Sequence, residues 1–415
     1  MTDWDSKLDP RTQLIHHPYV PPAQYAAPQP GVFKASTVFF PTAEAMRTRR
    51  WMDKSGYTYG LHGTPTSYLL EERLCALEGG LQCLLVPSGL AALGLVALSL
   101  LKTGDEVLIP DNAYGPNKAI AEGELRNWGI THQYYDPMDP EDLEAQISSR
   151  TKLVWLEAAG SVTLEFPNLL EMVRVCQRRK VLTALDNTWG AGLAFRPFDL
   201  DAESGPHSVG VDISTHALTK YPSGGGDVLM GSVITRNAAL HHQLKLTHMR
   251  FGFGVGMNDV ESVLRSLPSM ALRYQAHDAA TRTLARWAQK QPEFVQVLHP
   301  ALETSPGHQD WKALCGSAVG TAAGLFSVII DACYPQHAVD AFCDALRLFK
   351  LGYSWGGPIS LVVPYELETM RTTWPAHLAK GTLVRFSIGL EEVADLQADL
   401  MQALEAMHQS LLASR

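Results

Sequence analysis

Short hydrophobic runs alternate with segments of helical spacing between about residue 63 and residue 235. These runs have the length of buried strands and are rich in Val, Leu and Ile. We predict strands at 81–86, 106–110, 152–157, 181–186, 212–215 and 228–235, and helices at 66–77 and 88–100. Buried strands that alternate with helices form a mainly parallel sheet covered on both faces. The pattern therefore predicts an α/β fold.

The last third of the chain has a different pattern. We predict long helical material at 261–290, strands at 324–331 and 382–388, and a closing amphipathic helix at 393–412. This pattern is typical of a smaller second domain. We therefore divide the chain into an N-terminal arm at 1–62, a ligand-binding domain at 63–265 and a C-terminal domain at 266–415.

The first sixty residues have little periodicity and many prolines, which are Pro18, Pro21, Pro22, Pro28 and Pro30. Proline favours extended backbone in the residue before it. We predict an extended arm that contacts a neighbouring subunit, because docking would explain its apolar content. Disorder is the alternative.

Composition narrows the function classes. The 415 residues carry a formal net charge of -9, which argues against nucleic acid as a partner because phosphate binding needs a basic face. The beginning of the chain does not resemble a signal peptide, and the most apolar stretch, 90–101, is too short to span a bilayer. The six cysteines form no C-x-x-C pair or zinc pattern, so we predict buried, reduced thiols in a cytoplasmic protein.

Polar residues follow several of the predicted strands. Asp186 lies at the end of one strand, and Ser88 and Tyr114 follow two others. Ligands of parallel sheets bind at the carboxyl ends of the strands. We therefore expect the chemistry of the protein to lie at this edge of the sheet.

Three segments here have two interpretations each. A carboxylate at Asp186 could pair with a cationic ring nitrogen, or it could cap a helix or form a structural ion pair. Lys220, next to a hydroxyl residue and a glycine loop, could form a Schiff base with a carbonyl cofactor, or it could be a solvated lysine. The 88–91 segment could bind phosphate at a helix N-terminus, or Ser88 could be an ordinary N-cap.

Taken in order, these segments resemble the Cys/Met-metabolism family of pyridoxal-phosphate (PLP) enzymes. The resemblance spans nearly the whole chain and rests on motifs at 59–66, 77–80, 87–92, 113–116, 186–189, 219–221 and 385–391. Within the family, the segments 157–165 and 353–357 and the position of Trp189 most resemble the bacterial cystathionine β-lyases. The resemblance implies an aspartate-aminotransferase-like (fold type I) large domain with a mainly parallel seven-stranded sheet, plus a smaller α+β C-terminal domain. It makes 63–265 the PLP-binding domain.

The resemblance also implies roles for individual residues. Lys220 is expected to hold PLP as a Schiff base and then to take the α-proton of the substrate, and Asp186 is expected to keep the pyridine nitrogen protonated. Tyr114 is expected to stack on the cofactor ring and to assist proton transfer. Further cofactor contacts are expected from Ser88, Gly89, Leu90 and Thr219. Substrate contacts are expected from Arg385, Ser354 and Trp355.

Tyr59 is expected to reach the phosphate or the substrate from a neighbouring subunit, where it also takes part in catalysis. This requires at least a dimer, and the family is usually a tetramer built from dimers that share active sites. The sequence departs from the family near this residue, because Leu61 stands where an arginine usually binds the phosphate of the adjacent subunit. His62 could take over part of that contact. Ala217 replaces a serine that often supplies a phosphate hydroxyl, and 358–360 departs at distal substrate contacts.

The function that the resemblance implies is β-elimination from L-cystathionine, which gives L-homocysteine, pyruvate and ammonia. Side activity on cysteine and cystine is expected, because they share the bond between sulfur and the β-carbon. The alternatives within the family are a cystathionine γ-lyase, a methionine γ-lyase and a γ-synthase. Alternatives of other classes are a PLP-binding regulator without catalysis and an α/β binding protein that does not use PLP. No metal is expected.

Overall fold

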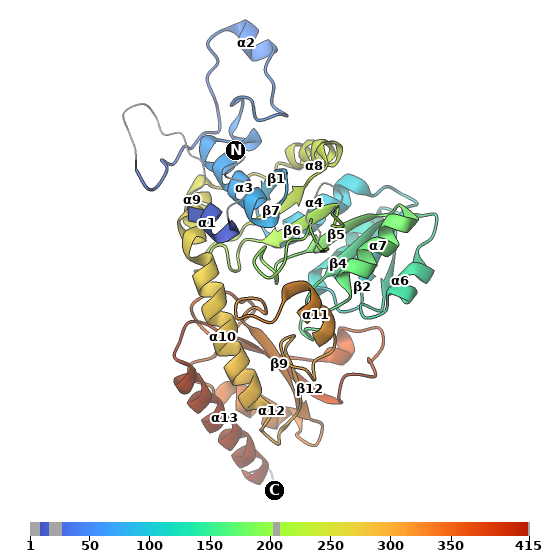
Figure 1. Ribbon diagram of the computed structural model, residues 1–415, viewed down its shortest axis with the longest axis vertical. Helices are drawn as coiled ribbons and strands as arrows, with labels where there is room; N and C mark the ends of the chain where they lie inside the picture. Colours follow the sequence, from blue (N-terminus) through green and yellow to red (C-terminus); the bar gives the residue numbers. More distant parts are fainter. Residues whose placement is uncertain (1–8, 16–26, 202–207, 414–415) are drawn as a thin grey trace.

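The computed structural model describes residues 9–15, 27–201 and 208–413 (Figure 1). A seven-stranded sheet forms its larger part, in the spatial order β1 (Gln82–Val86), β7 (Gly231–Thr235), β6 (Ile213–Ala217), β5 (Leu182–Asp186), β4 (Thr151–Glu157), β2 (Glu106–Pro110) and β3 (Thr131–Tyr135). Only β7 runs antiparallel to its two neighbours. The predicted seven-stranded, mainly parallel sheet is therefore confirmed, as is fold type I. The edge strand β3 was not among the predicted strands.

Both faces of this sheet are buried under helices. Leu156 and Leu185 belong to a hydrophobic core on one face, whereas Trp155 and Ala184 belong to a second core on the other. The covering helices are α3 (Pro65–Glu78), α4 (Gly89–Leu100), α5 (Gly115–Ile120) with the π-helical turn η3 (Ala121–Leu125), α6 (Pro140–Gln146), α7 (Leu169–Arg179), α8 (Ala238–Phe251) and α9 (Met257–Ser266). Burial on both faces explains why the strands read as continuous hydrophobic runs rather than as alternating ones.

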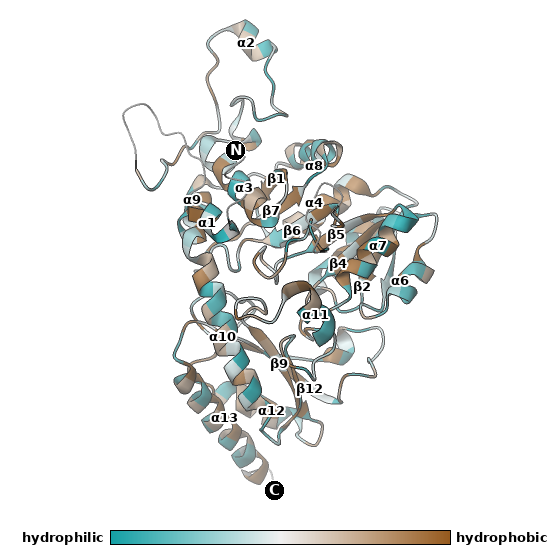
Figure 2. Cartoon of the chain, in the orientation of Figure 1, coloured by the Kyte–Doolittle hydropathy of each residue, from teal (hydrophilic) through white to brown (hydrophobic). Residues whose placement is uncertain are grey.

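A second sheet of five strands lies at the other end of the molecule (Figure 1). Its order is β10 (Lys350–Leu351), β11 (Leu361–Tyr365), β12 (Gly381–Ser387), β9 (Leu325–Asp331) and β8 (Phe294–Leu298). The accompanying helices are α10 (Met270–Ala288), α11 (His308–Cys315), α12 (Gln336–Ala345), a short turn η5 (Leu367–Thr369) and α13 (Val393–Ala413). Figure 2 shows alternating hydrophilic and hydrophobic residues along α13, as the amphipathic prediction requires.

The long helical stretch predicted at 261–290 is not continuous. The 3₁₀ turn η4 (Leu267–Ser269) separates α9 from α10. Pro268 lies in this turn, and a proline removes a backbone donor and clashes with the preceding helical turn. The proline therefore explains the break.

The N-terminal region contains two short helices, α1 (Pro10–Ile15) and α2 (Ala43–Arg47), and the turn η2 (Gly60–His62). Residues around α2 extend away from the large sheet (Figure 1), and the ring-bearing residue Phe39 is 94% exposed. Pro18, Pro21 and Pro22 lie outside the described residues. Contact of this arm with a neighbouring subunit stays a prediction.

All six cysteines are free. The prediction that they are buried is wrong for Cys333, which is exposed, and Cys315 is only partly buried. Cys333 lies in the turn after β9, where Asp331 accepts its backbone N–H, and such turns face solvent. None of the helices in the described ranges is both long and apolar enough to cross a bilayer.

Candidate active site

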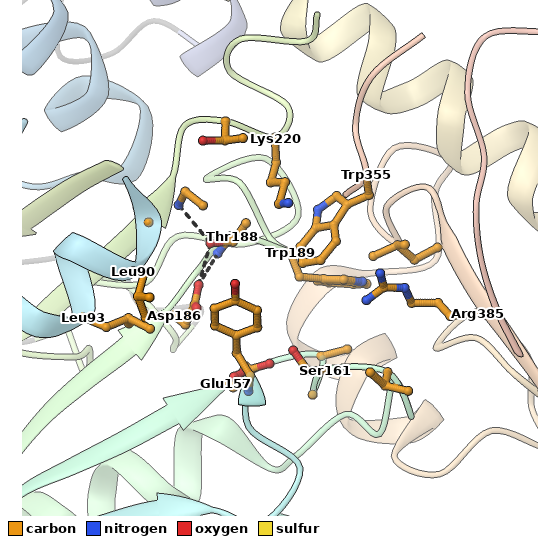
Figure 3. A pocket seen from close by; sticks show the side chains of 18 of the residues that line it. Leu90, Leu93, Glu157, Ser161, Asp186, Thr188, Trp189, Lys220, Trp355 and Arg385 are labelled. Carbon is orange, nitrogen blue, oxygen red and sulfur yellow. Dashed lines mark hydrogen bonds between the residues drawn. The ribbon is translucent and has the colours of Figure 1, made fainter. Parts of the chain in front are cut away.

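A cavity of about 330 Å³ lies at the carboxyl ends of the strands in the large sheet (Figure 3). Most of the site residues predicted from sequence line it, and these are Ser88, Gly89, Leu90, Tyr114, Asp186, Thr219, Lys220, Trp355 and Arg385. Trp355 and Arg385 come from the C-terminal part of the chain, so both sheets contribute walls. The expected convergence at this edge of the sheet therefore holds.

Asp186 is the last residue of β5, and its side chain is oriented by Thr188. The Oδ1 atom accepts hydrogen bonds from the backbone N–H of Thr188 at 3.0 Å and from its hydroxyl at 2.6 Å. The Thr188 hydroxyl accepts in turn from the N–H of Ala217 at 3.0 Å (dashed lines in Figure 3). Burial raises the pKa of Asp186, while Thr188 opposes this rise. The chain therefore holds a half-buried carboxylate that a cationic partner would stabilise.

Glu157 is a buried acid in the cavity, which we did not single out from sequence. It is the register partner of Asp186 across the parallel β4–β5 pair, and its Oε2 atom accepts the backbone N–H of Tyr114 at 2.8 Å. Burial, and then the charge of Asp186, raise the pKa of Glu157. The sequence does carry a signal for this pair, because the apolar runs 152–157 and 181–186 both end in an acidic residue.

Lys220 follows β6, and its amine points into the space between Asp186 and Trp355 (Figure 3). The Nζ atom lies 3.1 Å from the hydroxyl of Ser354 and 4.5 Å from the centre of the Trp355 ring. Burial, and then the nearby charge of Arg385, lower the pKa of Lys220 to about 8. A lysine with a lowered pKa has a larger share of neutral, nucleophilic amine near neutral pH.

The N-terminus of α4 forms another wall. The side chain of Ser88 caps the helix by accepting the N–H of Ala91 at 3.0 Å. Gly89 allows a close approach of this turn to β6, because a Cβ added there would lie 2.5 Å from the Cβ of Ala217. Among the described residues, no protein acceptor is assigned to the N–H groups of Gly89 and Leu90. These two N–H groups at a helix N-terminus suit an anion.

Thr219 also lines the cavity, but its hydroxyl already contacts the backbone. It donates to the carbonyl of Met230 at 3.3 Å and accepts the N–H of that residue at 3.2 Å. Its expected phosphate contact stays a prediction.

Arg385 lies on β12 and is buried between two aromatic rings. Its guanidinium carbon lies 5.4 Å from the ring centre of Trp355 and 5.2 Å from that of Tyr365. Burial lowers the pKa of Arg385, and its interaction with Tyr365 opposes this. Among the described residues, no carboxylate forms an ion pair with it. This buried cation is therefore placed to receive an anionic group inside the cavity.

The buried indole N–H groups of two tryptophans also belong to residues of the cavity. The Nε1 atoms of Trp189 and Trp355 have no hydrogen-bond partner in the described part of the chain. Both residues line the cavity. Sequence reasoning had used Trp189 as a mark of resemblance but had not included it, or Tyr365, among the site residues.

Tyr59 does not line the cavity of its own chain. It precedes η2 in the N-terminal arm and is 45% exposed. His62, the residue that we considered as a substitute for the usual arginine, stacks on Trp51 with ring centres 5.0 Å apart. Its Nδ1 atom also hydrogen-bonds the hydroxyl of Thr58 at 2.8 Å. These contacts hold the imidazole within the arm, and its contact with a phosphate stays a prediction.

Comparison with known proteins adds to this geometry. Residues 11–405 match the profile of the family described as "Cys/Met metabolism PLP-dependent enzyme". The chain belongs to the Cys/Met-metabolism family of PLP-dependent enzymes. A protein named cystathionine beta-lyase from Bordetella avium is 35% identical over 378 residues, which are 90% of each chain. A protein named L-alanine/L-glutamate racemase from Wolbachia pipientis is 33% identical over 385 residues, covering 90% of this chain and 92% of its own.

A solved structure, titled as metB from Corynebacterium glutamicum, has the same fold. It superposes with a TM-score of 0.85 at 26% identity, over 97% of this chain and all of its own. The cofactor of this family is PLP, and the protein is a PLP-dependent enzyme of Cys/Met metabolism.

The residues of the cavity fit PLP. Asp186 offers a half-buried carboxylate for a cationic ring nitrogen, and Lys220 offers an amine with a lowered pKa for an aldehyde. The N–H groups of Gly89 and Leu90 offer donors for a phosphate at the N-terminus of α4. The cavity therefore offers a fitting partner to the ring nitrogen, the aldehyde and the phosphate of the cofactor.

Proposed function

We propose that this enzyme cleaves L-cystathionine by β-elimination, with water, to L-homocysteine, pyruvate and ammonia. The observation that carries the proposal is the arrangement of three groups in one cavity: the amine of Lys220, the half-buried acid Asp186 and the buried cation Arg385. The similarity to a protein named cystathionine beta-lyase supports the choice of substrate. Cysteine and cystine are proposed as weaker substrates.

The proposed cofactor contacts follow from the donors and acceptors of the cavity. Lys220 holds PLP covalently, Asp186 pairs with its ring nitrogen, and Tyr114 stacks on the ring. Bound PLP supplies a carbonyl group for amines and a ring that accepts electrons from the α-carbon. The phosphate is bound by the N–H groups of Gly89 and Leu90, next to Ser88, and by the hydroxyl of Thr219.

The proposed substrate contacts lie on the opposite wall. Arg385 binds the α-carboxylate through the planar fork of its guanidinium, which matches a carboxylate better than an ammonium does. Trp355 lines this end of the pocket, and the hydroxyl of Ser354 accepts a hydrogen bond from the amine of Lys220 and keeps it oriented. Once the amine of the substrate has displaced Lys220 from PLP, the freed amine of Lys220 would take the α-proton. Burial raises the pKa of Tyr114, so its hydroxyl stays protonated near neutral pH.

The proposal includes a homo-oligomer. Tyr59 contributes to the active site of a neighbouring subunit, within a tetramer built from dimers. The division into 1–62, 63–265 and 266–415 is part of this proposal, because it assigns the first segment to the contact between subunits. We also propose that the enzyme works in the cytoplasm.

A product assay tests the function. The purified enzyme, with PLP, is incubated with L-cystathionine, and keto acids are identified by mass spectrometry. Pyruvate with homocysteine supports the proposal, whereas 2-oxobutyrate with cysteine would indicate a γ-lyase. Lys220→Ala serves as the control and should produce no keto acid. If no thioether amino acid gives a keto acid while PLP remains bound, the enzyme is not a lyase.

Amino-acid racemisation is the second candidate, because a relative that covers 90% of this chain is named a racemase. Racemisation needs removal of the α-proton from one face of the α-carbon and delivery of a proton to the opposite face, and Lys220 can serve the first step. Chiral chromatography after incubation with L-alanine and L-glutamate tests it. D-amino acids formed faster than pyruvate from cystathionine would make racemisation the main activity.

A further inference from the structure

Two buried carboxylates join the two sheets of the molecule next to the cavity. Glu165 lies in the segment after β4 and Asp111 follows β2, so both belong to the large sheet. Both bind the connection between β11 and β12, residues 366–380, which belongs to the smaller sheet. We call this connection the bridging segment.

Glu165 has no exposed surface and accepts hydrogen bonds from four side chains. Two of the donors are in the bridging segment: Arg371 at 2.5 and 2.7 Å, and His377 at 2.5 Å. Two come from the large sheet: Asn112 at 2.9 Å and Thr163 at 2.7 Å. A buried carboxylate with this many donors fixes the geometry of all of them, because none can leave without exposing a charge to an apolar environment.

Asp111 forms a second connection between the large sheet and the bridging segment. It accepts the backbone N–H of Thr372 at 3.0 Å and the hydroxyl of that residue at 2.9 Å. Lys118 donates to Asp111 at 2.9 Å and to the carbonyl of Met370 at 2.8 Å. The bridging segment is therefore attached to the large sheet at two points.

Both attachment points are directly connected to residues of the cavity. Asp111 is three residues before Tyr114, and Ser161 lies in the same loop as Glu165. On the other side, the bridging segment ends where β12 begins, four residues before Arg385. Val162 also packs in one hydrophobic cluster with Leu378 of the bridging segment and Leu383 of β12.

We propose that Glu165 and Asp111 are positioning residues for Arg385, because they fix the smaller sheet at the distance from the large sheet that substrate binding requires. This rests on the proposed role of Arg385 as the group that binds the α-carboxylate. Lys220 and Asp186, the proposed covalent and ring-nitrogen contacts of the cofactor, both lie at or just after the ends of strands of the large sheet, and of their hydrogen bonds only the one from Lys220 to Ser354 reaches the C-terminal part of the chain. A loosened attachment should therefore weaken recognition of the carboxylate while PLP binding stays intact.

The test uses two small ligands on the PLP-loaded enzyme. Glycine and methylamine share an amine, but only glycine has a carboxylate. Their dissociation constants are measured from the change in absorbance of the bound cofactor, for wild type, Glu165→Gln and Asp111→Asn. We expect glycine affinity to fall by about 10- to 100-fold, since an error of about 1 Å in placement can cost 10²-fold. Affinities for methylamine and PLP should stay within about twofold of wild type.

Glu106→Gln is the matched control. Glu106 is also a buried carboxylate, with donors from Ser148, Thr151 and Gln133. It lies at the amino end of β2, at the opposite edge of the sheet from the cavity. General destabilisation by a lost buried charge should affect this variant equally, whereas its glycine affinity should not change.

Milder variants keep the test decisive if Glu165→Gln does not fold. Thr372→Val removes one hydroxyl donor, and His377→Ala removes a donor whose side chain is 34% exposed. Each should weaken glycine binding in the same direction, by less. Unchanged glycine binding, or equal losses for glycine and methylamine, would overturn the inference. The readout needs no turnover, so a failure of the proposed β-elimination would be recognised separately, by the absence of pyruvate from wild type.

Discussion

The role of Arg385 gives a prediction whose size can be worked out from its surroundings. The guanidinium is buried between Trp355 and Tyr365, so water that enters the space after its removal supplies neither its charge nor its paired donors. Arg385→Lys keeps the charge but loses the paired hydrogen bonds of the fork, and a hydrogen bond to a charged group contributes about 1.5–3 kcal/mol. This corresponds to a loss of roughly 10- to 150-fold in kcat/KM for cystathionine. The loss should fall mainly on KM.

Arg385→Ala is the more severe change. It leaves the carboxylate of the substrate without a buried partner, which costs about 3–5 kcal/mol, or roughly 10²- to 10⁴-fold. Free guanidinium ion should restore part of the activity of this variant, because the vacated space lies between the same two rings. Steady-state kinetics with and without guanidinium measure both effects. A Lys variant within threefold of wild type, or an Ala variant that guanidinium does not rescue, would refute the role of Arg385.

Three further predictions concern the cofactor and the charges. The rate at which the apoenzyme binds PLP covalently, followed by absorbance, should rise with pH and level off above about 8, the pKa to which Lys220 is lowered; a midpoint at the ordinary lysine value would contradict this. Leu61→Arg should tighten PLP binding by about tenfold, the effect of one charge-assisted hydrogen bond, and unchanged affinity in a fluorescence titration would exclude a phosphate contact at this position. The pKa of Glu165 is lowered from 4.5 to about 2, first by its hydrogen bond from His377, against burial. Its ionised form therefore stabilises the fold above pH 4.5, and this contribution is lost as the pH falls toward 2. The melting temperatures of wild type and Glu165→Gln should accordingly converge in acid, and a gap that widens there would show the opposite sign.

Most strands of the large sheet and several residues of the site could be predicted from the sequence, because each is marked by its immediate sequence neighbours. Asp186 ends an apolar run, Lys220 follows another, and Arg385 is an isolated charge in a strand, so each stands out in the sequence itself. Strand β3 was not predicted because it lies at the edge of the sheet, where its polar residues have no hydrophobic run to mark them. Pro268 could have marked the break between α9 and α10.

The rest of the site depends on contacts that no local pattern carries. Glu157 gains its importance from its register with Asp186 across two strands. Glu165 and Arg371 are 206 residues apart in sequence, and each alone resembles an ordinary surface charge. Tyr365 lies on β11 beside Arg385 only because these strands pair antiparallel. Such roles follow from tertiary pairing, which hydrophobic periodicity does not specify.

The tight contact between Gly89 and Ala217 limits how this site can be altered. Since a methyl group at position 89 would come within 2.5 Å of the methyl group already at 217, position 89 cannot take a side chain without moving the strand that carries Ala217. An engineer who wished to reinstate the family's serine at 217 would have to accommodate its hydroxyl in the direction of the cavity. Libraries that vary position 89 should therefore yield few folded, cofactor-loaded variants, whereas position 217 can be varied with glycine kept at 89.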